Sequence, residues 1–156
     1  MKTERTALDE IAFQLQYQAR TERELTDKLT AKGYEADEIG AAMEKAKGYG
    51  WVDDRQYARR MIETARTGTV KGSRSIRFRL KQKGVSEAII EECVGEMDPQ
   101  TELDKALRLC AAVMAKNAGA EKRRVREKCY RALASRGFEY DVISAAVSRA
   151  LQAEEE

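Results

Sequence analysis

Few residues in this sequence have the type and spacing that a catalytic site needs. Asp53 and Asp54 form a carboxylate pair at the start of an expected helix, where they could hold a metal ion or act as acid and base. With no other ligand residues around them, we interpret them as a helix N-cap and a first-turn acid that complements the helix dipole. The chain has no histidine, which removes the commonest general base and metal ligand and any Ser-His or Cys-His nucleophile.

Segment 68–73, Gly-Thr-Val-Lys-Gly-Ser, superficially resembles a phosphate-binding loop. Its glycines are separated by three residues instead of four, its lysine precedes the second glycine, and no strand leads into it. We therefore interpret it as a connection between helices. We expect no enzymatic activity, no metal and no cofactor, since nothing supplies a nucleophile or an activated water.

Basic side chains are the more informative chemistry. Between residues 71 and 83 there are six cations and no acid. At about 100° per residue, the cations at positions 74, 77 and 81 share one flank of a helix, and an aromatic ring lies beside them. The residues expected on this surface are Lys71, Arg74, Arg77, Phe78 and Lys81.

A second stretch repeats this arrangement, with the expected surface residues Arg123, Arg124, Arg126 and Tyr130. Near the N-terminus the corresponding flank carries Arg23, Thr26 and Thr30, so it is less basic. A solvated charged face is the alternative interpretation. Because two stretches direct cations and one ring the same way with no acids nearby, we favour a surface that binds phosphates or an acidic partner.

The elements that position these residues are all expected to be helices. Apolar residues recur every three or four positions, and no stretch alternates with period two. Thr21 with Glu24, and Asp53 with Gln56, are spaced as capping boxes. Thr101 with Asp104 is a weaker version, and Pro99 is expected to end the preceding helix and to lie in a linker.

One segment occurs three times and sets the organisation of the chain. When the glycines are aligned, each has a leucine four residues before it and an isoleucine six residues after it. The aligned glycines are Gly33, Gly84 and Gly137. They are 51 and 53 residues apart, a period typical of stacked units that cannot bury their apolar faces alone. Each glycine is expected to end a helix in the left-handed conformation.

The sequence therefore predicts an all-α protein of nine helices. They form three tandem three-helix repeats, at residues 1–52, 53–98 and 99–156, in an elongated, curved, solenoid-like body. Its 156 residues carry a net charge of +2, with acids in excess before residue 53 and bases in excess after it. Three cysteines without CxxC spacing are expected to be small buried hydrophobes. We expect a soluble, cytoplasmic monomer, with no membrane association.

Segment 50–58, Gly-Trp-Val-Asp-Asp-Arg-Gln-Tyr-Ala, resembles the RecX family, bacterial regulators of the RecA recombinase. The similarity continues through Lys71-Gly72, Ile76, Leu80, Lys83-Gly84-Val85 and Ile89-Ile90. The similarity is looser in the first and third repeats. In the third repeat, Arg136 replaces the lysine before the glycine, and the first repeat is the least basic of the three.

The resemblance implies three three-helix repeats, in agreement with the periodicity. It also implies that the chain binds recombinase–DNA filaments and inhibits strand exchange, ATP turnover and coprotease function in DNA repair and the SOS response. The alternative is a sequence-independent module that binds single- or double-stranded DNA directly.

Overall fold

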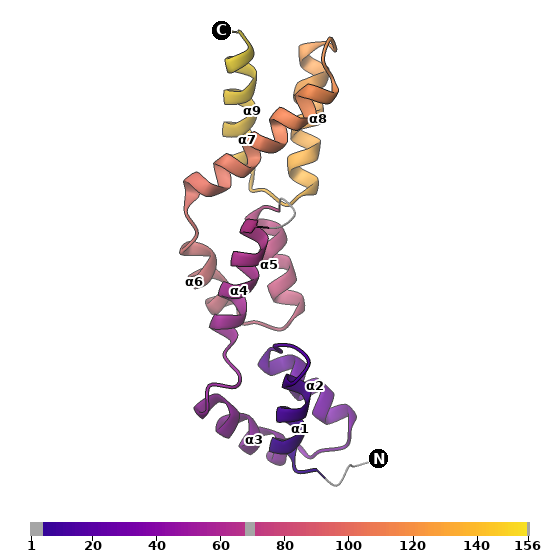
Figure 1. Cartoon of the computed structure of the whole chain (residues 1–156), viewed down its shortest axis with the longest axis vertical. Helices are drawn as coiled ribbons and strands as arrows, with labels where there is room; N and C mark the ends of the chain where they lie inside the picture. Colours follow the sequence, from indigo (N-terminus) through magenta and orange to yellow (C-terminus); the bar gives the residue numbers. More distant parts are fainter. Residues whose placement is uncertain (1–4, 68–70, 156) are drawn as a thin grey trace. The chain divides into compact units, whose positions relative to one another are not determined.

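The computed structural model describes residues 5–67 and 71–155, which carry nine α-helices and no strand (Figure 1). The helices are α1 (Ala7–Leu15), α2 (Glu22–Ala31), α3 (Ala36–Gly48), α4 (Asp54–Thr67), α5 (Ser73–Gln82), α6 (Glu87–Gly95), α7 (Pro99–Lys116), α8 (Lys122–Ser135) and α9 (Tyr140–Glu155). The prediction of an all-α fold is confirmed. Of the segment 68–73 that the sequence analysis considered, residues 68–70 lie outside the described residues, and Ser73 begins α5.

The contacts divide the chain into two compact units, which we describe separately. The first is Met1–Arg60 with Leu80–Cys93, and the second is Met61–Arg79 with Val94–Glu156. In the first, α1 packs against α2 and α3; in the second, α7 lies across α8 and α9 (Figure 1). The middle three-helix group is thus divided between the two units, and the repeat boundaries expected from the sequence stay a prediction.

Equivalent apolar positions of the three repeats are buried. The residues predicted to be buried are at most 5% exposed: Leu29, Ile39, Leu80, Ile90, Leu133 and Ile143. The three cysteines are also buried and unbridged. Burial, followed by the neighbouring Cys129, raises the pKa of the Cys110 thiol to about 12, so this cysteine behaves as a small hydrophobe.

The repeated glycines end α2, α5 and α8 in the left-handed conformation, with φ of 93°, 85° and 78° at Gly33, Gly84 and Gly137. At each one, the amide of the next residue donates to the carbonyl of the leucine four residues before the glycine. These bonds are Tyr34 to Leu29 (3.2 Å), Val85 to Leu80 (3.1 Å) and Phe138 to Leu133 (3.2 Å). This is a Schellman cap, which explains why a leucine and an apolar residue flank every repeated glycine.

In the first unit, the Gly84 cap of α5 lies against the N-terminus of α2. The Thr21 hydroxyl donates to the Lys83 carbonyl (2.6 Å), and Lys83 Nζ lies 3.4 Å from a Glu24 carboxylate oxygen. Thr21 and Glu24 also form the predicted capping box. A Cβ on Gly84 would overlap the Arg23 side chain, so any larger residue here would force Arg23 to move.

The second unit contains the equivalent contact, between the Gly137 cap of α8 and the N-terminus of α5. We call each of these two contacts a joint. The amide of Gly72 donates to Arg136 O (2.8 Å), and the amides of Arg74 and Ser75 donate to Gly137 O (2.8 and 3.3 Å). A Cβ on Gly137 would overlap Ser75, including its backbone nitrogen. A Cβ on Gly72 would likewise overlap the backbone of residues 137 and 138.

A carboxylate completes each joint by accepting the first amide of the middle helix. Asp54, the first residue of α4, accepts from the Glu22 amide (3.0 Å), and Glu102 of α7 accepts from the Ser73 amide (2.8 Å). Glu102 is buried and lies 3.3 Å from Nζ of Lys105, which is only 2% exposed. Because a buried charge is costly without a partner, this pair depends on both members.

The start of α7 differs from the sequence prediction. Asp98 is its N-cap and accepts from the Gln100 amide (3.0 Å), and Pro99 is the first helical residue. The predicted linker around Pro99 and the cap at Thr101 were therefore wrong. Proline suits the first position of a helix because its missing amide would have no intrahelical acceptor there.

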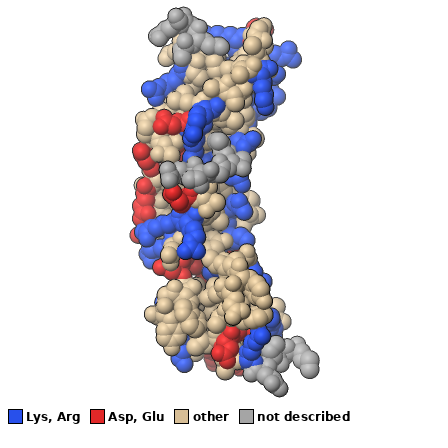
Figure 2. Space-filling model, viewed as in Figure 1, with Lys and Arg blue, Asp and Glu red and all other residues tan. Residues whose placement is uncertain are grey.

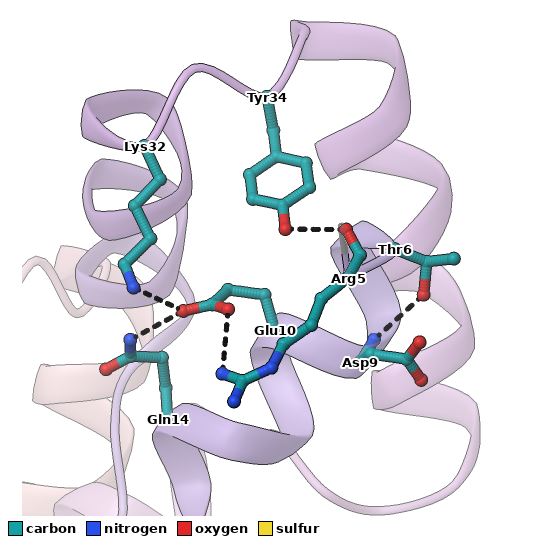
Figure 3. Close-up of polar contacts among 7 residues, drawn as sticks. All are labelled: Arg5, Thr6, Asp9, Glu10, Gln14, Lys32 and Tyr34. Carbon is teal, nitrogen blue, oxygen red and sulfur yellow. Dashed lines mark hydrogen bonds and ion pairs between the residues drawn. The ribbon is translucent and has the colours of Figure 1, made fainter. Parts of the chain in front are cut away.

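In the first unit, the carboxylate of Glu10 is buried and binds three donors (Figure 3). Lys32 Nζ lies 2.7 Å away, Gln14 donates at 2.9 Å and Arg5 at 3.4 Å. Burial alone would raise the pKa of Glu10, but the bonds from these donors lower it below its ordinary value of 4.5. The Tyr34 hydroxyl donates to Arg5 O (2.7 Å), which fixes the start of α1 against the Gly33 cap.

The three repeated glycines should respond differently to alanine. Gly33→Ala should cost about 1–2 kcal/mol of unfolding free energy, since only the left-handed conformation opposes a side chain there. Gly84→Ala should cost more because Arg23 must move, and Gly137→Ala should cost more than about 3 kcal/mol because backbone blocks the Cβ. Urea denaturation followed by circular dichroism measures this order.

Gly40→Ala is the matched control for these substitutions. Gly40 lies inside α3 with no atom near its Cβ position, so alanine should stabilise by up to about 1 kcal/mol. Equal losses at the three repeated glycines would contradict the two joints described above.

The Glu10 cluster should make stability depend on acid. Because the folded pKa of Glu10 is lowered, its stabilising contribution is present above the ordinary value of 4.5 and is lost as pH falls through the folded pKa. Glu10→Gln should therefore lower the unfolding free energy near neutral pH, and the difference from wild type should shrink toward about pH 3. Urea titrations at several pH values test this. Glu44→Gln, at an exposed carboxylate, should show no such dependence; a constant Glu10→Gln difference would be evidence against the charged cluster.

Candidate partner-binding surface

The predicted surface residues of the middle repeat are not equally available. Arg74 is exposed and Phe78 is 63% exposed, whereas Lys71 is half-buried. Arg77 is half-buried and forms an ion pair with Glu139, so the expectation that no acid lies near these cations was wrong. Lys81 is exposed and belongs to the first unit.

On α8, the predicted cations are exposed. Arg124 and Arg126 lie on the surface, and Arg123 lies 3.7 Å from Glu127, one helical turn away. Tyr130 is half-buried. Figure 2 shows basic side chains gathered around α8 at the upper right of the molecule, with little red among them.

A groove in the second unit brings several of these side chains together. This third-repeat groove has a volume of about 530 Å³ and is lined by Arg74, Arg126, Glu127, Tyr130, Arg131, Ala134, Tyr140 and Ile143. Arg74 comes from α5, Tyr140 and Ile143 from α9, and the others from α8. The surfaces predicted on α5 and α8 therefore meet at Arg74, Arg126 and Tyr130.

The sequence analysis missed Tyr140 as a member of this site. Tyr140 is 71% exposed at the first position of α9. The repeat register contained a signal for it, because Tyr140 aligns with Ala36 when Gly137 is aligned with Gly33. A large exposed ring in place of alanine distinguishes the third repeat from the first.

The first unit has a groove at the equivalent positions, with a smaller volume of about 220 Å³. This first-repeat groove is lined by Glu22, Thr26, Thr30, Ala36, Ile39, Gly40, Met43 and Glu44. In the repeat register, Glu22 replaces Arg126, Thr26 replaces Tyr130, and the isoleucines coincide. The same scaffold therefore presents an acidic groove in one repeat and a basic, aromatic groove in another.

The cations of α8 are placed against the helix dipole. Its first turn contains Lys122, Arg123 and Arg124 and no acid, and its N-cap Glu121 makes no side-chain capping bond. Cations are unfavourable near a helix N-terminus, by about 0.3–1 kcal/mol each when exposed. The helix dipole does not explain this placement, which favours a role in binding.

Asp53 and Asp54 have structural positions. Asp53 accepts from the Gln56 amide (3.2 Å), which confirms it as the N-cap of α4. Asp54 accepts from the Glu22 amide, and burial raises its pKa. Among the described residues, no group of three or more His, Cys, Asp or Glu could hold a metal ion. No helix in the described part of the chain has the length and apolar character to cross a membrane.

The described chain is thus an all-α protein built from repeated three-helix units, the third of which carries a basic, aromatic groove. Models of the first, second and third three-helix domains of RecX match residues 12–45, 53–94 and 100–147. The chain belongs to the RecX family.

Curated relatives are longer than this chain. The regulatory protein RecX of Clostridium botulinum (strain Eklund 17B / Type B) is 34% identical over 137 residues, which cover 86% of this chain and 64% of the relative. The regulatory protein RecX of Bacillus pumilus (strain SAFR-032) is 27% identical over 142 residues, 91% of this chain and 54% of the relative. The chain therefore spans less than two thirds of the length of these relatives.

Two crystal structures have a similar fold. A regulatory protein RecX aligns with a TM-score of 0.79 and 26% identity, covering 90% of this chain and 70% of that one. RecX from Lactobacillus salivarius aligns with a TM-score of 0.88 and 24% identity, covering 92% and 94% of the two chains, and this second likeness shows the fold alone.

The role of Asp54 can be separated from its charge. Asp54→Ala should cost about 1 kcal/mol of unfolding free energy through loss of the bond from the Glu22 amide. Asp54→Asn should restore most of this loss, since it keeps the acceptor oxygen and removes a charge that burial disfavours. Urea denaturation of both variants decides the matter: equal losses would mean that the charge, and not the hydrogen bond, stabilises the joint.

Proposed function

We propose that this protein regulates a RecA-type recombinase by binding recombinase–DNA filaments and inhibiting strand exchange, ATP turnover and coprotease function. Membership of the RecX family and the name that its relatives share, regulatory protein, support this proposal. Within the molecule, the observation that carries it is the third-repeat groove, where cations from α5 and α8 meet around aromatic rings.

The cations of this groove are available to a partner. Arg74, Arg126 and Arg131 are exposed and form no ion pair with any described residue. Folding therefore does not use their charge, in contrast to that of Arg77 and Arg123. Such cations bind phosphate or carboxylate groups through charge-assisted hydrogen bonds.

A filament would present the same contact many times along its length. Several modest contacts carried by one chain act at a high effective concentration, so the whole chain binds much more tightly than one isolated repeat. This suits repeats that share a scaffold but differ in surface chemistry. In this proposal the protein acts as a monomer in the cytoplasm, where the recombinase works on DNA.

Reversing charge in the groove should weaken filament binding. The double variant Arg74→Glu/Arg126→Glu should lose at least about tenfold in affinity for recombinase-coated single-stranded DNA, because two cations of the groove become repulsive. Co-sedimentation with filaments at low and high salt measures this, and wild-type binding should weaken as salt rises. Arg149 is an exposed cation of α9 that lies outside the groove. Arg149→Glu is therefore the control for the effect of reversing one charge elsewhere on the surface.

Circular dichroism should show equal helicity for all variants. Unchanged co-sedimentation of the double variant would contradict a role for the groove in filament binding. Equally tight binding to naked and recombinase-coated strands would instead favour a sequence-independent DNA-binding module.

A further inference from the structure

We propose that the third-repeat groove binds an acidic peptide segment of a protein partner and accepts one apolar side chain of that segment on its floor. This deepens the proposed function, on which it rests, by naming the chemistry that the same site recognises. Nucleic acid, whose phosphates would bind the same cations, is the competing occupant.

The floor of the groove favours an apolar side chain. Ile143 is only 5% exposed, Tyr130 is half-buried, and with Ala134 they form a mostly apolar lining. The volume of about 530 Å³ lies within the range of about 300–1,000 Å³ typical of ligand pockets. An aliphatic or aromatic side chain placed here would leave water, while phosphate groups would gain nothing from this floor.

The rim of the groove favours carboxylates beside that side chain. Arg74 lies on α5, and Arg126 and Arg131 lie on α8, so cations from two helices surround the floor. A guanidinium matches the planar geometry of a carboxylate and can bind it through two hydrogen bonds. An extended segment with separated acids could therefore meet these cations in turn.

An acid in the lining opposes a continuous polyanion. Glu127 lines the groove, and Glu139, the residue before Tyr140, pairs with Arg77 of α5. A nucleic-acid strand carries a charge at every phosphate and would have to pass the Glu127 carboxylate. A peptide can place a neutral residue at that point, so the charge distribution favours a peptide over nucleic acid.

The first repeat shows that packing does not require these residues. The first repeat keeps the buried leucine and isoleucine, Leu29 and Ile39. Its equivalent groove has Glu22, Thr26 and Ala36 where the third repeat has Arg126, Tyr130 and Tyr140. The scaffold forms with either set. Tyr130 packs against the core of the third repeat, whereas the exposed Tyr140 and Arg126 are not explained by folding. Their clustering at one groove is explained by a ligand that is both acidic and apolar.

The test is a titration of the full isotope-labelled chain, followed by backbone amide spectra. The probe is a short synthetic peptide of glutamate and serine with one central phenylalanine, added to about 1 mM so that weak binding is detected. The same peptide with serine in place of phenylalanine, and a thymidine oligonucleotide of similar length, are the comparison ligands. We expect the phenylalanine peptide to shift amides of Tyr130, Ala134 and Ile143, and the serine peptide to bind at least about tenfold more weakly.

Substituting first-repeat residues provides the matched variant. Tyr130→Thr/Tyr140→Ala should weaken the phenylalanine peptide at least about tenfold, and Arg126→Glu alone, at an exposed position, should do the same without disturbing packing. Arg149→Glu, the same charge change at an exposed position of α9 outside the groove, should leave binding unchanged. Amide shifts far from the groove show whether each variant is folded.

Three results would overturn the proposal: no shifts at the groove at the highest peptide concentration, equal affinity for the serine peptide, or tighter binding of the oligonucleotide at the same amides. The proposed function is judged separately by co-sedimentation with filaments. Filament binding without peptide binding would reject only the peptide site, and peptide binding without filament binding would reject only the recombinase as partner.

Discussion

The close approach between a left-handed glycine cap and the N-terminus of another repeat's middle helix is the constraint on which this structure depends. At Gly84 and Gly137 the backbone both reverses out of a helix and contacts a neighbouring helix, and only glycine satisfies the two demands together. Backbone carbonyls at the end of one helix then accept hydrogen bonds from donors at the start of the other helix. Polar groups that a helix terminus leaves unpaired therefore find partners. Gly33 ends its helix in the same way but meets no neighbour. The repeated segment is thus one local cap used in two packing situations.

The two joints satisfy their donors by different means. In the first unit, Thr21 uses its hydroxyl and the half-buried Asp54 accepts an amide. In the second, Gly72 uses its own amide, and the accepting carboxylate of Glu102 is buried with Lys105. Gly72 has no side chain because the backbone of residues 137 and 138 occupies that space, so a side-chain cap like Thr21 cannot form there. The buried pair of Glu102 and Lys105 stabilises the start of α5, which has no side-chain cap of its own. Burying this pair has a desolvation cost, which is smaller for the half-buried Asp54 of the first unit.

How far the sequence predicted this structure depends on whether a feature is local or long-range. The capping box at Thr21, the glycine conformations and the buried leucines follow from spacings within one helix, and all were predicted. The approach of Gly72 to Phe138 and the pairing of Arg77 with Glu139 join residues more than sixty positions apart, and no spacing within a helix indicates them. Pro99 was ambiguous in the sequence, since proline both ends helices and begins them, and only Asp98 capping Gln100 decides between the two. Tyr140 aligns with Ala36 in the repeat register, but no spacing within α9 indicates that it lines a groove with residues of α5 and α8.

Duplication of one scaffold separates what folding requires from what binding requires. Positions that face the core keep leucine and isoleucine in every repeat, because a change of volume there would leave a cavity or a clash. Apart from the shared isoleucine, most positions lining the grooves are free of that demand, and they differ in charge and in size between the first and third repeats. Cations in the first turn of α8 even oppose the helix dipole. A chain whose net charge is only +2 can therefore hold a distinctly basic site, because cations of α5 and α8 meet at one groove. Specificity in such a protein comes from the groove residues, while the capped and packed glycine joints hold them in place.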